Sequence, residues 1–294
     1  MRDWKTLFRD YASDIRAWWP EKSQRQADKM TNRMSAIRRK LNYTQHDLID
    51  AVVGVAQFRS DTTPLTVFMP NCGSSGSHWI EPMLQELGGY QACGEIYLSH
   101  RIRESISLLS PAQRTSFLDA VHIAHGRRDP RQLVHTRFVN TAHNWETPQL
   151  FHAPARTVFI ARNPIDIVVS RSFRKSSYRR FIAPEMGDRE YVRRNTNLVN
   201  RFYTQALQTG LDGFVRYEDV RADGVRALDF LMRVLNDPRQ VSDLAGVLRD
   251  FAKDGALVAR TNIYSGPTVD IPDWVRSQVA SELNDSPRSF GYEY

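Results

Sequence analysis

The chain has 294 residues, 41% of them hydrophobic, and a formal net charge of +7 at pH 7. This length suits one large domain or two small ones, and the six tryptophans predict a substantial core and argue against general disorder. No apolar run approaches the roughly 20 residues of a membrane helix, no signal peptide is recognisable, and the two cysteines form no Cys-x-x-Cys pair, so we expect a cytoplasmic protein without a transmembrane segment. The charge favours anionic partners, but it is too dispersed to indicate nucleic acid.

Residues 1–60 are predicted to form an N-terminal helical extension. Apolar side chains recur there at the spacing of amphipathic helices. They are Trp4, Leu7, Phe8, Tyr11, Ile15, Met30, Met34, Ile37 and Leu41. We interpret them as a packing layer or as a surface for a second copy of the chain, which leaves a homo-oligomer open. The segment Ser60-Asp-Thr-Thr-Pro64 is predicted to end this helical region.

Strands and helices alternate after residue 60. The predicted strands are Leu65–Pro70, Gln132–Val139, Thr157–Ala161 and Gly213–Tyr217. Helical stretches are predicted at 77–88, 101–109, 111–125, 164–180, 189–208, 222–235 and 241–253. Such alternation is typical of an α/β fold whose central, mostly parallel sheet is covered by helices on both faces. We therefore expect one three-layer domain over residues 61–294.

A loop rich in glycine and serine follows the first predicted strand. The sequence reads Thr66-Val-Phe-Met-Pro-Asn-Cys-Gly-Ser-Ser-Gly-Ser-His-Trp79, an apolar strand that leads through the loop into a helix. A loop of this kind at a helix N-terminus presents backbone N–H groups and the positive end of a dipole to an anion. The segment therefore predicts a phosphate site.

A second candidate anion site follows the strand at Thr157–Ala161. The sequence Val158-Phe-Ile-Ala-Arg-Asn-Pro-Ile-Asp-Ile-Val-Val-Ser170 is a buried strand that ends at an arginine and turns into a helix carrying a serine. Two such sites in one sheet predict a ligand with two separated phosphates.

These segments resemble the signatures of the sulfotransferases that use 3′-phosphoadenosine-5′-phosphosulfate (PAPS). The family's second signature, Arg-Asn-Pro-x-Asp-x-x-x-Ser, is matched at every fixed position from Arg162 to Ser170. The segment Phe214-Val-Arg-Tyr-Glu-Asp-Val220 is similar to the family's strand-ending Tyr-Glu-Asp-Leu. The resemblance covers residues 65–294. It implies a P-loop-like fold, PAPS as the donor, 3′-phosphoadenosine-5′-phosphate (PAP) as the product, and no metal.

The family's first signature, Pro-Lys-Ser-Gly-Thr-Thr-Trp-Leu, can be aligned on Pro70 or on Trp79, and we favour Trp79 because that register keeps a Ser, a Gly, a hydroxyl and the Trp. The lysine that stabilises the leaving phosphate is missing in both registers. Loop N–H groups, the hydroxyls of Ser74 and Ser77, and His78 are expected to supply part of that stabilisation. The resemblance implies that the cofactor is bound by Ser74, Ser75, Gly76, Ser77, His78, Trp79, Arg162, Ser170 and Tyr217. Among these, Trp79 is expected to stack on the face of the adenine and Tyr217 to contact its edge.

Sulfuryl transfer to a hydroxyl needs a base near the acceptor. Family members with a histidine base carry it in a strand reading Lys-Thr-His, and His135-Thr-Arg137 resembles this triplet with its cation and imidazole exchanged. Alternate residues of a strand point to one face. We therefore predict His135 as the base and Arg137 as a sulfate or substrate contact, with His78, Glu95 and His100 as rival bases.

The acceptor class stays open between a small molecule and a saccharide or lipid hydroxyl. A basic run follows Ser170 without nearby acidic residues, and it consists of Arg171, Arg174, Lys175, Arg179 and Arg180. Such a run is usually a solvated helix face, but beside a cleft it would attract an anionic acceptor such as an acidic saccharide.

Other phosphate-binding chemistries fit the loop poorly. A nucleotide kinase needs a loop lysine, which residues 66–100 lack. A cysteine phosphatase needs an arginine at the sixth position after its cysteine, and His78 occupies that position after Cys72. The Gly-x-Gly-x-x-Gly of a dinucleotide fold is also missing. The leading hypothesis is an active sulfotransferase, and the alternative is a non-catalytic relative that binds PAP or PAPS. A nucleic-acid-binding protein would need a recognition module, and none is recognisable.

Overall fold

The computed structural model describes residues 3–62, 66–126, 128–141, 144–150, 155–174, 183–239 and 271–294, with residues 179 and 246 in addition. The chain divides into two compact units. The first comprises Met1–Phe68, Leu84–Ala142 and Glu146–Arg156, and the second comprises Met69–Met83, His143–Trp145 and Thr157–Tyr294. The predicted helix at 241–253 lies outside the described residues except at Gly246.

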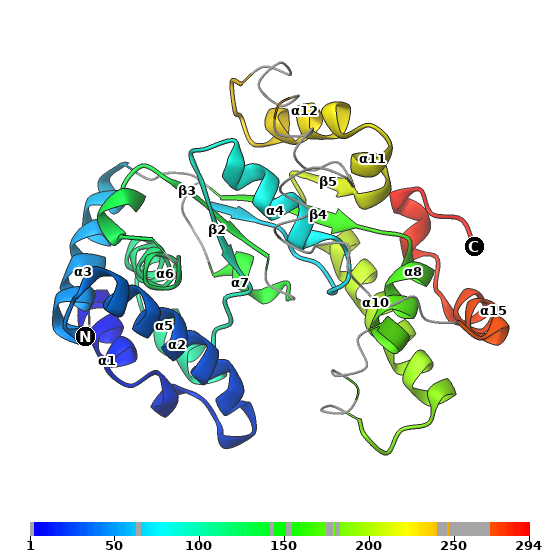
Figure 1. Ribbon diagram of the computed structural model, residues 1–294, viewed down its shortest axis with the longest axis horizontal. Helices are drawn as coiled ribbons and strands as arrows, with labels where there is room; N and C mark the ends of the chain where they lie inside the picture. The colour runs from blue at the N-terminus through cyan, green and yellow to red at the C-terminus, as the bar shows by residue number, and fades with distance from the viewer. Residues whose placement is uncertain are drawn as a thin grey trace. The chain divides into compact units, whose positions relative to one another are not determined.

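In the described part of the chain, the strand pairs whose register is defined are parallel, which confirms the predicted α/β class (Figure 1). The strands are β1 (Thr66–Phe68), β2 (Tyr90–Gly94), β3 (Arg137–Asn140), β4 (Ala155–Ala161) and β5 (Gly213–Arg216). Within the first unit the strand order is β2-β3-β1, and in the second unit β4 pairs with β5. Within the first unit, Val67 and Ala92 both lie opposite Val139, and in the second unit Ile160 lies opposite Val215.

The first unit combines β1–β3 with the N-terminal helices. Its main helices are α1 (Trp4–Ser13), α2 (Gln24–Leu41), α3 (Gln45–Thr62), α5 (His100–Ser107) and α6 (Pro111–His125). The predicted apolar positions of α1 and α2 are buried, except that Leu41 is only partly buried. The helical character of residues 1–60 is thus confirmed, and their apolar face packs within the unit. A domain boundary at residue 60 stays a prediction.

The second unit contains most of β4, all of β5 and the later helices. These are α8 (Pro164–Val169), a π-helical turn (Ser170–Arg174), α10 (Asp188–Gln208), α11 (Tyr217–Ala222), α12 (Gly224–Val234), α15 (Asp273–Glu282) and a 3-10 helix η5 (Ser286–Phe290). Helix α4 (Ser77–Glu86) begins in this unit and ends in the first. In the core of the second unit, four aromatic rings pack against one another, and they belong to Phe159, Phe202, Tyr203 and Phe290.

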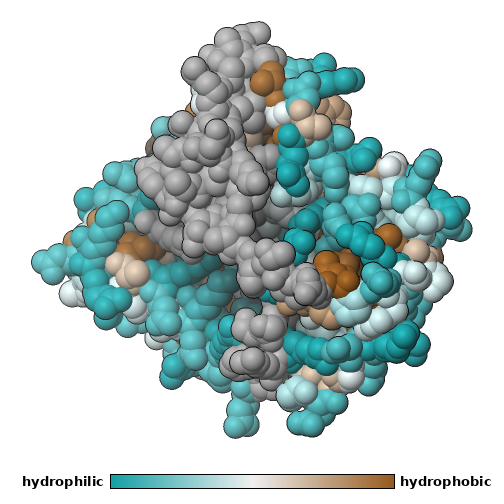
Figure 2. Space-filling view, turned by 45° about the vertical axis from the view of Figure 1, so that its right-hand side comes forward, coloured by the Kyte–Doolittle hydropathy of each residue, from teal (hydrophilic) through white to brown (hydrophobic). Residues whose placement is uncertain are grey.

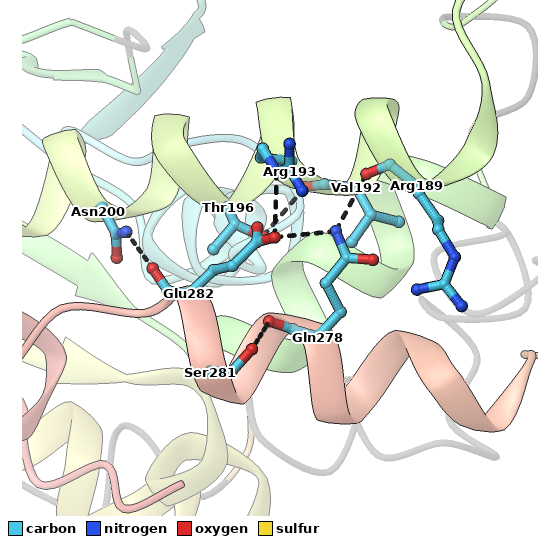
Figure 3. A network of polar contacts seen from close by, with 8 residues as sticks. All are labelled: Arg189, Val192, Arg193, Thr196, Asn200, Gln278, Ser281 and Glu282. Atoms are coloured by element: carbon cyan, nitrogen blue, oxygen red, sulfur yellow. Dashed lines mark hydrogen bonds and ion pairs between the residues drawn. The ribbon is translucent and has the colours of Figure 1, made fainter.

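Polar contacts join α10 to α15 along their length (Figure 3). The Glu282 carboxylate accepts hydrogen bonds from Arg193 Nε at 3.2 Å and from Gln278 Nε2 at 3.0 Å. The Asn200 amide donates to the Glu282 carbonyl at 2.8 Å and accepts from the N–H of Asn284 at 3.0 Å. Asn200 therefore supplies partners for backbone groups that the end of α15 leaves unused.

The predicted strand at 132–139 is wrong in its first half. Residues Pro130–Leu133 form a 3-10 helix, His135 lies in a turn, and β3 begins only at Arg137. The cause is Arg59, a fully buried residue whose guanidinium donates to the carbonyls of Leu133 and Thr136, each at 2.7 Å. Because these carbonyls converge on one cation, the backbone between them curls instead of extending.

The described residues on the face shown in Figure 2 are mainly hydrophilic, and the hydrophobic ones stand in small separate groups. None of the helices in the described part of the chain is both long and apolar enough to span a membrane.

Candidate anion-binding site

The loop between β1 and α4 has an unusual backbone. Three of its residues have positive φ values, 75° at Gly73, 58° at Ser74 and 89° at Gly76. The side chain of Asn71 holds the curl, because its amide donates to the Met69 carbonyl at 3.1 Å and accepts from the Gly73 N–H at 3.0 Å. Successive N–H groups in such left-handed turns point into one concavity, which is the geometry of an anion-binding nest.

The loop retains unused hydrogen-bond donors. Among the contacts of the described residues, no hydrogen bond uses the backbone N–H of Ser74, Ser75 or Gly76. The hydroxyl of Ser74 is also buried without a partner in this part of the structure. Buried donors are normally paired, so the Ser74 hydroxyl, with the three N–H groups beside it, indicates a site for a ligand with several acceptor oxygens.

The residue that ends β4 contacts this loop. The guanidinium of Arg162 donates from Nη1 to the Ser74 carbonyl at 2.7 Å and lies 4.7 Å from the ring centre of Tyr217. Its Nε is buried and has no partner among the described residues. The Tyr217 ring in turn covers Gly76, because a Cβ atom at that glycine would lie 2.2 Å from Tyr217 Cδ2. The structure thus brings together Ser74, Gly76, Arg162 and Tyr217.

Helix α8 begins with its first amides already paired. Asn163 Oδ1 accepts from the N–H groups of Ile165 at 3.0 Å and Asp166 at 3.3 Å, and Pro164 has no N–H. A second anion would therefore be held by side chains, not by the helix end. Ser170, predicted for this role, is 8% exposed and opens the π-helical turn that follows α8.

Arg171 contacts this loop, whereas the sequence analysis considered it part of a basic run that is either a solvated helix face or an attractant for an anionic acceptor. Its Nη1 donates to the Cys72 carbonyl at 2.6 Å, and its Nε donates to Asn195 Oδ1 at 3.1 Å. Two arginines therefore contact carbonyl groups of one loop, Arg162 at Ser74 and Arg171 at Cys72. The only signal in the sequence was that Arg171 directly follows the last residue of the second motif.

The other predicted loop residues surround the start of α4. Ser75 and Ser77 are buried, and Ser75 Oγ lies 3.6 Å from Cys72 Sγ. Burial raises the pKa of the Cys72 thiol, so the sulfur is a neutral packing group at neutral pH. The side chains of His78 and Trp79 lie outside what the structure describes, and the choice of register stays a prediction.

The predicted base and its partner do not share a strand face. His135 is exposed and precedes β3, whereas Arg137 is the first residue of β3 and donates to the Tyr90 hydroxyl at 3.1 Å. His135 thus lies at the amino end of its strand, while ligands of parallel sheets bind at the carboxyl ends. The geometric reason for choosing it is wrong, and its role as base stays a prediction.

Of the rival bases in the first unit, Glu95 directly follows the carboxyl end of β2. Its carboxylate accepts from Tyr97 Oη at 3.0 Å and pairs with Lys29 Nζ at 3.3 Å. His100, at the start of α5, is exposed and paired with Glu104 at 3.2 Å. Glu95 thus lies next to the carboxyl end of its strand, whereas His135 lies at the amino end of its strand.

A scan of known protein families finds no family that matches the chain, and a search of curated proteins finds no match either. Among solved structures, the chain is similar to a mouse sulfotransferase, SULT7A1, complexed with PAP. The TM-score is 0.41 and the sequence identity is 17%, over 80% of this chain and 82% of that chain. Function is therefore argued below from the contacts of this chain's own residues.

Proposed function

We propose that the protein is a PAPS-dependent sulfotransferase that acts on a hydroxyl acceptor. The observation that supports this most is the meeting of two motifs that are distant in sequence. Arg162 of the second motif binds Ser74 of the first at 2.7 Å and stacks on Tyr217. A nucleotide with a phosphate at each end would need both motifs in one place. A cytoplasmic location and a homo-oligomer remain predictions.

The residues of the loop fit the phosphosulfate end of PAPS. The N–H groups of Ser74, Ser75 and Gly76 and the buried Ser74 hydroxyl have no partner among the described residues, and they are donors for the acceptor oxygens of such a group. Arg162, with its unpaired Nε, and Ser170 are proposed to bind the 3′-phosphate, and Tyr217 and Trp79 to contact the adenine. When bound, PAPS supplies the activated sulfuryl group.

Arg171 is proposed to supply the positive charge that the missing loop lysine would have provided. Its guanidinium is half-buried and lies within hydrogen-bond distance of the loop at Cys72. A fixed cation beside a phosphate group stabilises charge that develops there. The hydroxyls of Ser74 and Ser77 and the side chain of His78 complete the proposed set.

Ligand titration tests the assignment without knowledge of the acceptor. PAP should raise the melting temperature in a dose-dependent way, roughly with the logarithm of its concentration above the dissociation constant, because it binds only the folded state. Arg162→Ala should weaken PAP binding about 10- to 100-fold, the scale of charge-assisted hydrogen bonds, and should weaken AMP binding much less, because AMP lacks the 3′-phosphate. Arg201→Ala, an exposed change on α10, is the matched control. Equal losses of PAP and AMP affinity would contradict the 3′-phosphate assignment.

A non-catalytic nucleotide-binding protein is the second candidate, because the loop lysine is absent and His135 lies at the amino end of its strand. Labelled PAPS with a panel of phenolic, saccharide and lipid acceptors separates the two functions. Transfer of label supports the enzyme, while tight PAP binding without transfer to any acceptor class supports the binding protein. Glu95→Gln and His135→Ala, assayed side by side, then identify the base.

A further inference from the structure

A buried tyrosine fixes the backbone of Arg162. Tyr203 on α10 is fully buried, and its hydroxyl accepts from the N–H of Arg162 at 3.0 Å and donates to the carbonyl of Arg162 at 2.5 Å. Burial raises the pKa of this hydroxyl well above its ordinary value, so it keeps its proton and remains a donor at neutral pH. One side chain therefore pairs both polar backbone groups of the same residue.

The ring of Tyr203 is itself held in place. Phe159 and Phe290 pack edge-on against it, with ring centres 5.1 Å and 5.4 Å away. Because the ring is enclosed in the core of the second unit, its hydroxyl has little freedom to follow a shift of the backbone at Arg162.

Glu218 fixes the following residue. One carboxylate oxygen accepts from the backbone N–H of Asn163 and the other accepts from the hydroxyl of Tyr292, both at 2.8 Å. Tyr292 is 3% exposed, and the Arg216 guanidinium lies 4.9 Å from its ring centre. The carboxylate is thus held on both sides, and its outer partner is the third residue from the C-terminus.

These contacts fix the backbone at Arg162, and the hydrogen bond to the Ser74 carbonyl fixes the guanidinium at the other end of the side chain. We propose that Tyr203 and Glu218 are positioning residues for 3′-phosphate recognition, acting through the backbone of Arg162. This inference rests on the proposed function and assigns to it two residues that do not touch the ligand. Long side chains lose much conformational freedom on binding, so an arginine with a fixed start binds a phosphate more tightly than a loosely anchored one.

The test compares PAP with AMP in two matched tyrosine variants. Tyr203→Phe should weaken PAP binding about tenfold and AMP binding less than about twofold, the scale expected for one lost hydrogen-bonding group. Tyr191→Phe is the control, because Tyr191 is a buried residue of the same helix whose hydroxyl makes no hydrogen bond within the described part of the chain. This variant should bind both nucleotides as the original protein does. Isothermal calorimetry at one salt concentration provides the dissociation constants.

A pair of glutamate variants keeps the test informative if Tyr203→Phe folds poorly. Glu218→Gln retains an acceptor for the Asn163 N–H and should preserve the preference for PAP over AMP, whereas Glu218→Ala should reduce it. Equal losses for both nucleotides, or unchanged PAP binding in Tyr203→Phe and Glu218→Ala, would overturn the positioning role and leave the proposed function standing. Failure of the original protein to bind PAP at all would reject the proposed function and this inference together.

Discussion

Gly76 is the residue at which the loop after β1 has no room for a side chain. Its φ of 89° lies in the left-handed region, and the Tyr217 ring covers the position that a Cβ atom would take. Glycine is needed here for two separate reasons, the backbone conformation and the close approach of an aromatic ring.

Gly76→Ala should therefore lower the free energy of unfolding and also weaken PAP binding, because Tyr217 must move away from the loop. Gly88→Ala is the matched control, since Gly88 also has a positive φ, 75°, but nothing lies within 4 Å of its Cβ position. It should cost only the left-handed strain of about 1–2 kcal/mol and leave PAP binding intact. Urea unfolding and PAP titration of both variants provide the comparison, and identical effects would show that the ring contact contributes nothing.

At the scale of elements, α10 and α15 are joined by contacts of unequal value. The pair between Arg193 and Glu282 is largely exposed at its arginine, with 64% of that side chain accessible, and such pairs contribute little. The Asn200 amide instead pairs a carbonyl and an N–H at the end of α15. Loss of partners for backbone groups is the more costly change.

Asn200→Ala should lower the free energy of unfolding by about 1–2 kcal/mol because it removes two hydrogen bonds to backbone groups, one of them part-buried. Arg193→Ala should lower it by less than about 1 kcal/mol because it removes an exposed ion pair. Urea unfolding at one pH measures both. A larger effect of Arg193→Ala would show that the ion pair, and not the amide, joins the helices.

Elements with local signals could be predicted from the sequence. Helix α6 has the predicted bounds, Pro111–His125, and its local signals are clear, since Ser110 Oγ accepts a hydrogen bond from the Gln113 N–H at its start and Gly126 follows its end. Strand β2 was missed because Tyr90-Gln-Ala-Cys-Gly94 has neither alternation nor an apolar run, and it is stabilised by pairing with β3. The start of β3 was misplaced because Arg59, far away in sequence, curls the preceding segment.

The candidate site divides in the same way. Gly76 and Arg162 could be predicted because each lies in a short motif with its own local chemistry. The contacts of Arg171 and Tyr203 could not, because they are made between distant segments. Tyr203, for example, is separated from Arg162 by 41 positions in sequence, and nothing in its neighbourhood distinguishes it from an ordinary core tyrosine.

At the scale of the whole molecule, two buried histidines make stability depend on pH. His122 lies 3.0 Å from the Asn140 amide and His125 lies 3.1 Å from the Tyr11 hydroxyl, and burial lowers the pKa of each to about 3. The unfolded chain binds a proton at each imidazole below about pH 6.5, whereas the folded protein does not until about pH 3. The unfolded state therefore gains protons first as the pH falls.

The free energy of unfolding should be fully retained above about pH 6.5 and should fall below it. The slope contributed by each histidine approaches about 1.4 kcal/mol per pH unit between the two pKa values. His125→Gln keeps an acceptor for the Tyr11 hydroxyl and should remove the contribution of one histidine to the slope. Urea titrations between pH 7 and pH 4 measure it, and an unchanged slope in the variant would assign the acid sensitivity to other groups.

Both cysteines are free and buried, Cys93 in the first unit and Cys72 in the loop of the second. Alkylating reagents attack the thiolate and need access to the sulfur, so neither thiol reacts while its surroundings remain closed. The alkylation rate of each thiol therefore reports local opening of its own unit. The labelling rate at Cys72 measures how often the loop that Arg171 contacts opens locally, and the rate at Cys93 measures opening of the first unit separately.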